Sequence, residues 1–278
     1  MSRNTIFDIL ESQMDIDYEI FRIESLCEED AIEEGYAGYT LEDFIDQYCL
    51  ADWKNRNRCI SCEEMRNRLN ISSFHIKHQL QGNQILVYLE YIANLVQLCN
   101  TYIKNNSDYD VTKSYVYLQN NLMEIIHDLN YETMVFEEEE KVLLVEKDAA
   151  TSAVAEIVEP TLAYQIIEYN HFLLKGKIEQ KRKILVNLAN KVEPIRAEFK
   201  KKQIHKDLES NVGFLLNKLN VRHNNLSGKN AVPYVQNMTD AELEEWYDET
   251  YQMLLLCILE HDNIERNNKV SELKKIIV

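Results

Sequence analysis

Residues that interrupt regular secondary structure are scarce in this chain. Only six Gly and three Pro occur among its 278 residues. A β-sandwich places a turn about every ten residues, and Gly and Pro are the strongest turn formers, so their scarcity argues against an all-β fold. Hydrophobic residues make up 45% of the chain, which is enough for a core and excludes global disorder. We therefore expect a mainly α-helical protein built from helical bundles.

The sequence carries no signal for secretion or for a membrane. Residues 1–15 contain no apolar run after a basic stretch, unlike a secretory signal. No window approaches the roughly eighteen uncharged apolar residues that a transmembrane helix needs. Without a secretion signal, the six cysteines indicate reduced thiols rather than a disulfide framework. We predict a cytoplasmic protein with no membrane partner.

Hydrophobic periodicity predicts helices along most of the chain. Helix-start signals occur at Thr40, at Asp110, and at two capping boxes, Ser61 with Glu64 and Thr239 with Glu242. The last of these opens a long helix that runs through Ile258.

The helical pattern is interrupted at residues 132–146. Two β-prone runs, TMVF and VLLVE, are separated here by EEEEK, and they predict a two-stranded ribbon. We place a domain boundary at this ribbon. Residues 1–130 then form an acidic N-terminal helical domain, and residues 131–278 form a C-terminal helical bundle.

Charge is distributed unevenly along the chain. The formal net charge is −17, which by itself argues against nucleic acid as a partner. Residues 1–52 hold 15 acids and 2 bases, whereas residues 175–229 hold 5 acids and 14 bases. Because electrostatic fields fade over about 8 Å at physiological salt, a local basic face can act within an acidic molecule. The basic stretch is either a solvated helix face or a surface for a polyanion such as RNA.

The sharpest candidate site is the sequence Asn220-Val-Arg222-His223-Asn224-Asn225. An Arg guanidinium can hold a phosphate, and a neighbouring His can act as general acid or base near neutral pH. Cleavage of RNA through the 2′-hydroxyl needs both functions. We therefore assign Arg222 and His223 as candidate catalytic residues. We assign Asn224, Asn225 and Lys229 as candidate substrate-binding residues. The alternative is structural: Arg222 and Asn225 cap a helix, and His223 packs in the loop.

Two stretches, LLNKLNVRHNNLSGKN and YVQNMTDAELEEWYDETYQMLLL, carry a family resemblance. They resemble the C-terminal helical domain of bacterial abortive-infection proteins of the J type, which belong with the HEPN-like domains. The resemblance covers about residues 131–278. It implies a helical bundle that forms a homodimer and that acts in phage defence or a toxin-like response, often as a metal-independent ribonuclease. Arg222 and His223 are adjacent, whereas the usual signature separates Arg from His by several residues. A domain that binds RNA without cutting it is therefore the alternative.

A third set of residues has spacing close to that of a zinc site. Cys59 and Cys62 are followed by His75 and His78, but the two histidines are closer together than in a zinc finger, and Ser61 already forms a helix cap. We therefore expect no metal. We also expect no cofactor, because no Gly-rich phosphate loop is present.

A second class of function is a non-catalytic interaction protein. Its strongly acidic residues 1–52 would bind a basic protein partner.

Overall fold

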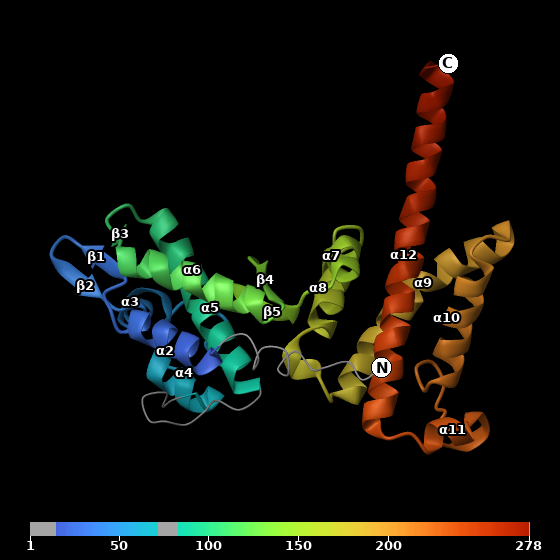
Figure 1. Cartoon of the computed structure of the whole chain (residues 1–278), viewed down its shortest axis with the longest axis horizontal. Coiled ribbons are helices and arrows are strands. Elements are labelled where there is room, and N and C mark those ends of the chain that lie inside the picture. Colours follow the sequence, from blue (N-terminus) through green and yellow to red (C-terminus); the bar gives the residue numbers. More distant parts are fainter. Residues whose placement is uncertain (1–14, 72–82, 278) are drawn as a thin grey trace. The chain divides into compact units, whose positions relative to one another are not determined.

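The computed structural model describes residues 15–71 and 83–277 and confirms the mainly α-helical class. The chain divides into two compact units, residues 1–147 (unit 1) and 148–278 (unit 2). Figure 1 labels their helices and strands. None of the helices in the described part of the chain combines the length and the apolar character needed to cross a bilayer.

Unit 1 is a set of helices with two small antiparallel sheets. In chain order its elements are α2 (Ile16–Cys27), β1 (Ile32–Glu34), β2 (Ala37–Tyr39), α3 (Leu41–Phe44), the π-helix η1 (Ile45–Cys49), α4 (Cys62–Leu69), α5 (Asn83–Asn105), β3 (Asp110–Val111), α6 (Lys113–Asp128), β4 (Tyr131–Phe136) and β5 (Lys141–Glu146). The first sheet has the order β2-β1-β3, with Ile32 opposite both Tyr39 and Val111. These strands differ from the wholly helical N-terminal domain that the sequence predicts over residues 1–130.

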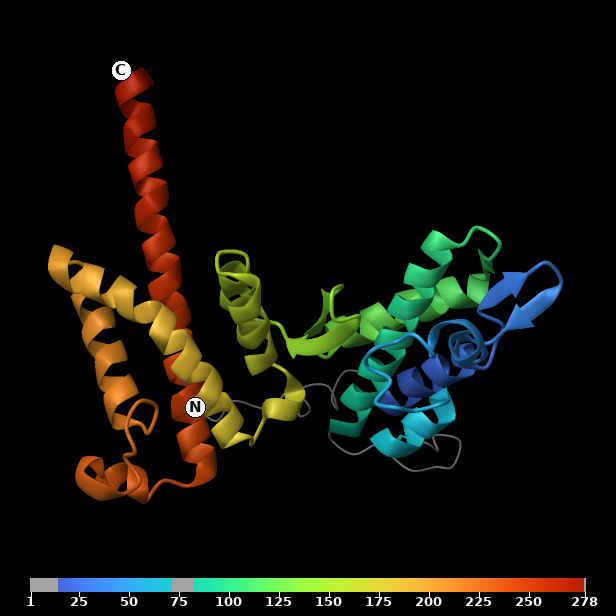
Figure 2. The same cartoon turned by 180° about the vertical axis from the view of Figure 1, so that it is seen from behind.

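The ribbon that we predicted near residues 132–146 is formed by β4 and β5. Tyr131 pairs with Glu146 at one end and Phe136 with Lys141 at the other. Figure 2 shows the ribbon following the end of α6. The Asn94 side chain on α5 bonds both the N–H and the C=O of Val142, each at 2.9 Å. Because the ribbon is anchored on α5, the unit boundary follows Lys147 rather than residue 130.

Unit 2 is a helical bundle, as the sequence predicted. Its elements are α7 (Ala149–Ala155), α8 (Pro160–Tyr169), η2 (Phe172–Leu174), α9 (Ile178–Lys202), α10 (Lys206–Lys218), η3 (Gly228–Asn230), α11 (Pro233–Gln236) and α12 (Asp240–Ile277). The core is continuous and includes Leu185 and Leu188 of α9, Leu216 of α10, and Leu254 of α12. The long final helix exists, and it continues past Ile258 to Ile277.

A buried lysine joins three elements of unit 2. Lys181 on α9 is 6% exposed, and its Nζ lies 2.7 Å from Asp248 Oδ1 and 2.8 Å from Glu244 Oε1 on α12. The same ammonium lies 5.0 Å from the ring centroid of Tyr169 on α8, and the Tyr169 hydroxyl donates to Asp248 at 2.9 Å. A buried ammonium is stable only when it is paired in this way.

Candidate nucleic-acid interface

Thirty consecutive residues of unit 2, 210–239, contain no Asp or Glu, although the whole chain has 47 acids in 278 residues. We call residues 210–239 the acid-free segment. It covers most of α10, the following loop and α11. Its basic side chains are Lys218, Arg222, His223 and Lys229, and it has no carboxylate, so it contributes only positive charge to the surface.

Helix α10 sorts the side chains of this segment into two sets. Val212, Leu215 and Leu216 are buried in the core of unit 2. Phe214 and Lys218 therefore lie on the opposite, exposed side, as helical spacing requires. Phe214 is 62% exposed, which is unusual for a large apolar ring.

The chain reverses direction directly after α10. Asn220 adopts a left-handed conformation with φ of 59°, which Asn tolerates better than most residues. The Arg222 N–H then donates to the Leu216 carbonyl at 3.0 Å, closing the helix end. Buried Leu219 and Val221 hold this turn on the core. Arg222 and His223 therefore leave the bundle side by side at the start of the loop.

Two buried asparagines brace the loop. The Asn220 N–H donates to Asn225 Oδ1 at 2.8 Å, and the Asn225 N–H donates to Asn220 Oδ1 at 3.1 Å. Asn225 Nδ2 also donates to the Asn230 carbonyl at 2.8 Å. Asn225 is only 2% exposed and its amide closes the loop, so it is not presented at the surface as a substrate-binding residue would be.

Asn224 has a local role as well, although its side chain is exposed. Its Oδ1 accepts from the N–H groups of Leu226 and Ser227, each at 3.1 Å, and its Nδ2 donates to Ser227 Oγ at 3.0 Å. This is an Asx turn, a local side chain–backbone arrangement that fixes loop geometry.

The two candidate catalytic residues have different surroundings. Arg222 forms an ion pair and hydrogen bond with Glu193 on α9, and it lies 3.4 Å from the Ala189 carbonyl. Its hydrogen bond is the main reason that the pKa of the Glu193 carboxyl is lowered. His223 is exposed. The guanidinium is thus neutralised in this conformation, whereas the imidazole is open to solvent.

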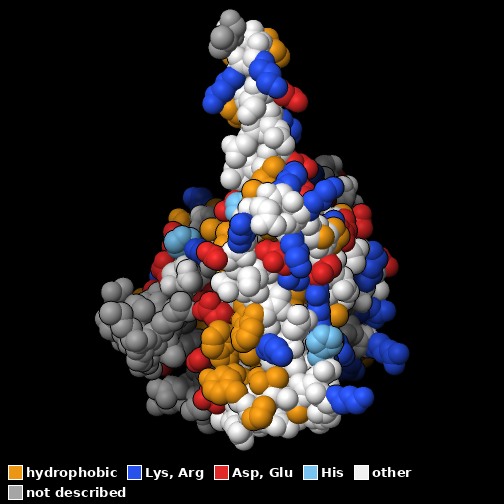
Figure 3. All heavy atoms as spheres, turned by 90° about the vertical axis from the view of Figure 1, so that its right-hand side faces the viewer, with side chains coloured by type: hydrophobic (Ala, Val, Ile, Leu, Met, Phe, Trp, Pro, Cys, Tyr) orange, Lys and Arg blue, Asp and Glu red, His pale blue; other side chains and the backbone are white. Residues whose placement is uncertain are grey.

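Exposed aromatic rings accompany the cations, and our sequence reasoning missed them. Tyr234 on α11 is 70% exposed, and the Gln236 side chain of the same helix bonds the Leu226 carbonyl at 2.9 Å, holding α11 against the loop. Figure 3 shows hydrophobic side chains gathered low on one face of unit 2, with Lys or Arg and a His to one side and Asp or Glu to the other. The sequence signal that could have pointed to this part of the surface is the run of thirty residues without Asp or Glu.

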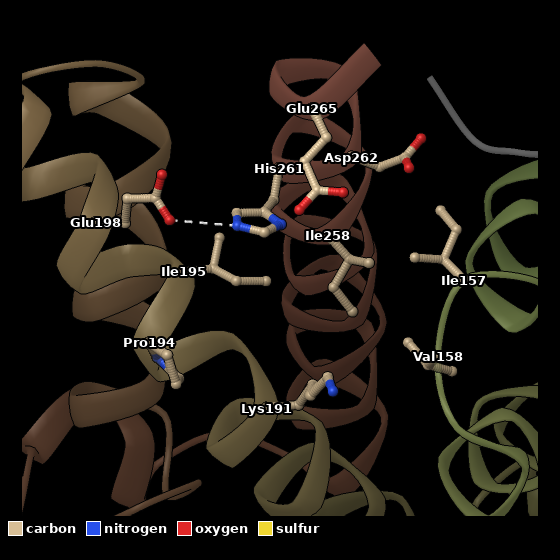
Figure 4. A pocket seen from close by; sticks show the side chains of 10 residues that line it. All are labelled: Ile157, Val158, Lys191, Pro194, Ile195, Glu198, Ile258, His261, Asp262 and Glu265. Carbon is tan, nitrogen blue, oxygen red and sulfur yellow. Dashed lines mark hydrogen bonds and ion pairs between the residues drawn. The ribbon is translucent and has the colours of Figure 1, made fainter. Parts of the chain in front are cut away.

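A hollow in unit 2 has the wrong charge for a polyanion. It has a volume of about 410 Å³ and lies between α9, α12 and the chain after α7. Figure 4 shows its apolar lining together with Glu198, His261, Asp262 and Glu265. His261 Nε2 lies 3.3 Å from Glu198 Oε2. Since one lysine, Lys191, faces three carboxylates here, the hollow does not extend the cationic face.

Only half of the candidate zinc site lies in the described part of the chain. Cys59 and Cys62 are buried beside the start of α4, and burial raises the pKa of the Cys62 thiol, which disfavours the thiolate that binds metal. His75 and His78 lie outside the described residues. Within those residues, no group of three or more His, Cys, Asp or Glu side chains is arranged to hold a metal ion.

Comparison of the chain with protein-family models, with curated proteins and with solved structures gave no match.

Proposed function

We propose that the protein binds RNA through the acid-free segment of unit 2, as a HEPN-like protein of phage defence or of a toxin-like response. The observation that carries this proposal is the composition of one segment of unit 2. Residues 210–239 display cations, side-chain amides and two exposed rings without a single carboxylate, in a chain whose net charge is −17. The resemblance to abortive-infection proteins supplies the biological setting.

The exposed groups match the chemistry of single-stranded RNA. Lys218, Arg222 and Lys229 offer positive charge to phosphates, and releasing the counterions of the backbone would make binding strongly dependent on salt. Phe214 and Tyr234 offer ring faces on which bases can stack, worth about 1–3 kcal/mol per base.

RNA cleavage requires one further step. His223 would act as the acid or base, and Arg222 would stabilise the charge that develops on the phosphate. Since Glu193 holds Arg222 in this conformation, the substrate phosphate must replace that carboxylate. Binding alone does not require this exchange, because Lys218 and Lys229 are exposed.

A salt titration and one double variant test the proposal. Fluorescence anisotropy with a labelled single-stranded RNA should give an affinity that falls steeply as salt rises. In bacteria expressing the protein, Arg222→Ala/His223→Ala should abolish RNA breakdown if the protein cleaves, with folding checked by circular dichroism. An affinity for RNA that does not change with salt would contradict the proposal.

A cluster of tyrosines in unit 1 favours a second candidate function, the binding of a basic protein. Four half-buried tyrosines surround the buried Phe44: Tyr39, Tyr48, Tyr102 and Tyr109. Neighbouring ring centroids in this cluster lie 5.0–6.2 Å apart. Tyr48 belongs to the π-helix η1, and such helices are frequent at functional sites.

The charges around the tyrosine cluster are negative. Glu34 Oε2 accepts from the Tyr39 hydroxyl at 3.4 Å and from the Tyr48 hydroxyl at 3.3 Å. Residues 23–53 contain ten acids and no Lys or Arg. Ring faces and a carboxylate together attract ammonium and guanidinium groups.

The second candidate predicts binding of a Lys- and Arg-rich peptide. Tyr48→Leu/Glu34→Gln should weaken that binding, whereas the matched control Tyr117→Leu/Glu124→Gln on α6 should not. Equal affinities for the two variants, measured by anisotropy, would remove the tyrosine cluster from consideration.

A further inference from the structure

Helix α12 extends beyond the bundle that it helps to form. Its buried residues end at Ile258, and every residue from Glu265 to Ile277 is exposed. Figures 1 and 2 show this part of α12 projecting past α9 and α10 of the same unit. We call residues 259–277 the stem. An isolated helix of about 13 residues is marginally stable in water, so the exposed part of the stem, residues 265–277, needs an explanation.

One side of α12 carries the spacing of a coiled coil. Starting at the exposed Leu256, the intervals alternate between three and four residues over seven positions. These positions, which we call the seam, are Leu256, Leu259, Asn263, Arg266, Val270, Leu273 and Ile277. Val270 is 48% exposed, Leu273 53% and Ile277 73%, so the apolar end of this seam is open. Apolar residues at such spacing are the a and d positions through which helices pair.

The charges of the stem change sign along its length. Residues 259–265 carry three acids and no Lys or Arg, for a net charge of −3. Residues 266–277 carry four bases and one acid, for a net charge of +3. Two stems pair favourably only when the basic end of one lies beside the acidic end of the other.

The residues of the seam also favour an antiparallel orientation of the two stems. In a parallel pair, Arg266 would face its own copy at a d position, and Lys269 would lie near Lys274 of the other chain; both contacts are repulsive. In an antiparallel pair centred between Asn263 and Arg266, Leu256 faces Leu273 and Leu259 faces Val270. Asn263 of each chain then faces Arg266 of the other chain at the polar centre of the pair.

The flanking charges of the antiparallel pair also match. Asp262 and Lys269 lie on the same flank of the seam, seven residues apart. Each Asp262 therefore comes near Lys269 of the other chain. We propose that the stem is a dimerisation element that pairs with the stem of a second copy in antiparallel orientation. This inference does not depend on RNA binding, because no residue of the acid-free segment takes part.

Sedimentation equilibrium of the full chain tests the dimer. The wild type should be a dimer, and Val270→Asp/Leu273→Asp should weaken the dimer more than tenfold. The matched control Val116→Asp/Tyr117→Asp, at exposed positions of α6, should remain dimeric. Because all four positions are exposed, circular dichroism should show that both variants are folded. A wild type that stays monomeric, including one whose stem is covered by another part of its own chain, would overturn the proposal.

Cysteine cross-linking tests the orientation. Leu256→Cys/Leu273→Cys should form a disulfide-linked dimer under mild oxidation, because an antiparallel pair brings these positions together and a disulfide needs Cα atoms within about 7 Å. Leu256→Cys alone and Leu273→Cys alone should not. The wild type is the control for the native thiols, of which Cys27 is half-buried and the other five are buried. Efficient cross-linking of Leu273→Cys alone would show a parallel pair and overturn the antiparallel assignment.

Discussion

The Arg222 guanidinium at the end of α10 is held by the Glu193 carboxylate on α9. Glu193 also binds Arg196, whose Nη1 lies 3.2 Å from the same carboxylate oxygen. One carboxylate therefore pairs with two arginines next to the acid-free segment. In the proposed RNA complex, this carboxylate competes with RNA phosphate for Arg222.

Glu193→Gln should strengthen RNA binding, because it frees Arg222 for phosphate. A half-exposed ion pair is worth about 0.5–1 kcal/mol, so we expect a two- to fivefold gain in affinity at low salt. The control is Glu179→Gln, an exposed acid at the other end of α9 that removes the same charge. Equal gains in affinity for both variants would show that only net charge matters and would contradict a competition between Glu193 and RNA phosphate for Arg222.

Gly213→Ala should destabilise unit 2, although Ala is normally the better helix former. A Cβ at this position would lie 2.3 Å from Arg196 Nη2. That guanidinium is buried and is bonded to the Glu209 carboxylate at 2.8 Å and to the Glu209 carbonyl at 3.2 Å, so it cannot move without losing these bonds. We expect a loss of about 1–3 kcal/mol in urea unfolding. Ser210→Ala on the exposed side of α10 is the control, and a stabilised Gly213→Ala would contradict the packing described here.

Lys181→Met should cost about 3 kcal/mol of unfolding free energy, because it leaves the carboxylates of Glu244 and Asp248 facing each other without their cation. Lys183→Met, two residues along α9 and exposed, should cost less than about 0.5 kcal/mol. Denaturant unfolding measures both changes. Adding Glu244→Gln and Asp248→Asn to Lys181→Met should recover part of the loss, and no recovery would show that the lysine acts through packing alone.

The buried thiol of Cys257 should make stability fall at alkaline pH. Burial raises the pKa of Cys257 from 9.0 to about 12. Between these values the unfolded chain has lost the proton and the folded chain has kept it, so stability falls as pH rises. The contribution is complete below pH 9, and the slope for one group is at most about 1.4 kcal/mol per pH unit. Cys257→Ala should flatten the decline between pH 9 and 11 in urea unfolding, and an unchanged slope would contradict this role.

Local sequence signals predicted helix starts where the capping residues lie close together in the chain. The Thr239 N–H donates to Glu242 at 2.8 Å and the Glu242 N–H to Thr239 at 3.3 Å, as the capping box predicted. The N-cap predicted at Asp110 was wrong. Asp110 pairs with Glu33 in the sheet, and Thr112 caps α6 instead. That pairing joins residues far apart in sequence, and the strands have only two or three residues, so no periodicity could reveal them.

In the candidate site, too, the sequence predicted local relationships and not those between residues far apart in the chain. The sequence indicated that Arg222 and His223 lie together at a helix end, because they are adjacent. It could not indicate that Arg222 is bound to Glu193, which precedes it by 29 residues on another helix. The spacing of Phe214 from the buried Val212, Leu215 and Leu216 was a signal that its ring is exposed, but no periodicity in the four-residue α11 could indicate that Tyr234 is exposed.

The most direct test of RNA binding by the acid-free segment compares two charge-matched triple variants. Lys218→Ala/Arg222→Ala/Lys229→Ala removes three cations from the segment, and Lys175→Ala/Lys177→Ala/Lys183→Ala removes three exposed cations elsewhere in unit 2. Anisotropy with one single-stranded RNA at fixed salt should show at least a tenfold loss for the first variant and less than a threefold loss for the second. Equal losses, or no binding by the wild type, would contradict the assignment of this surface to RNA.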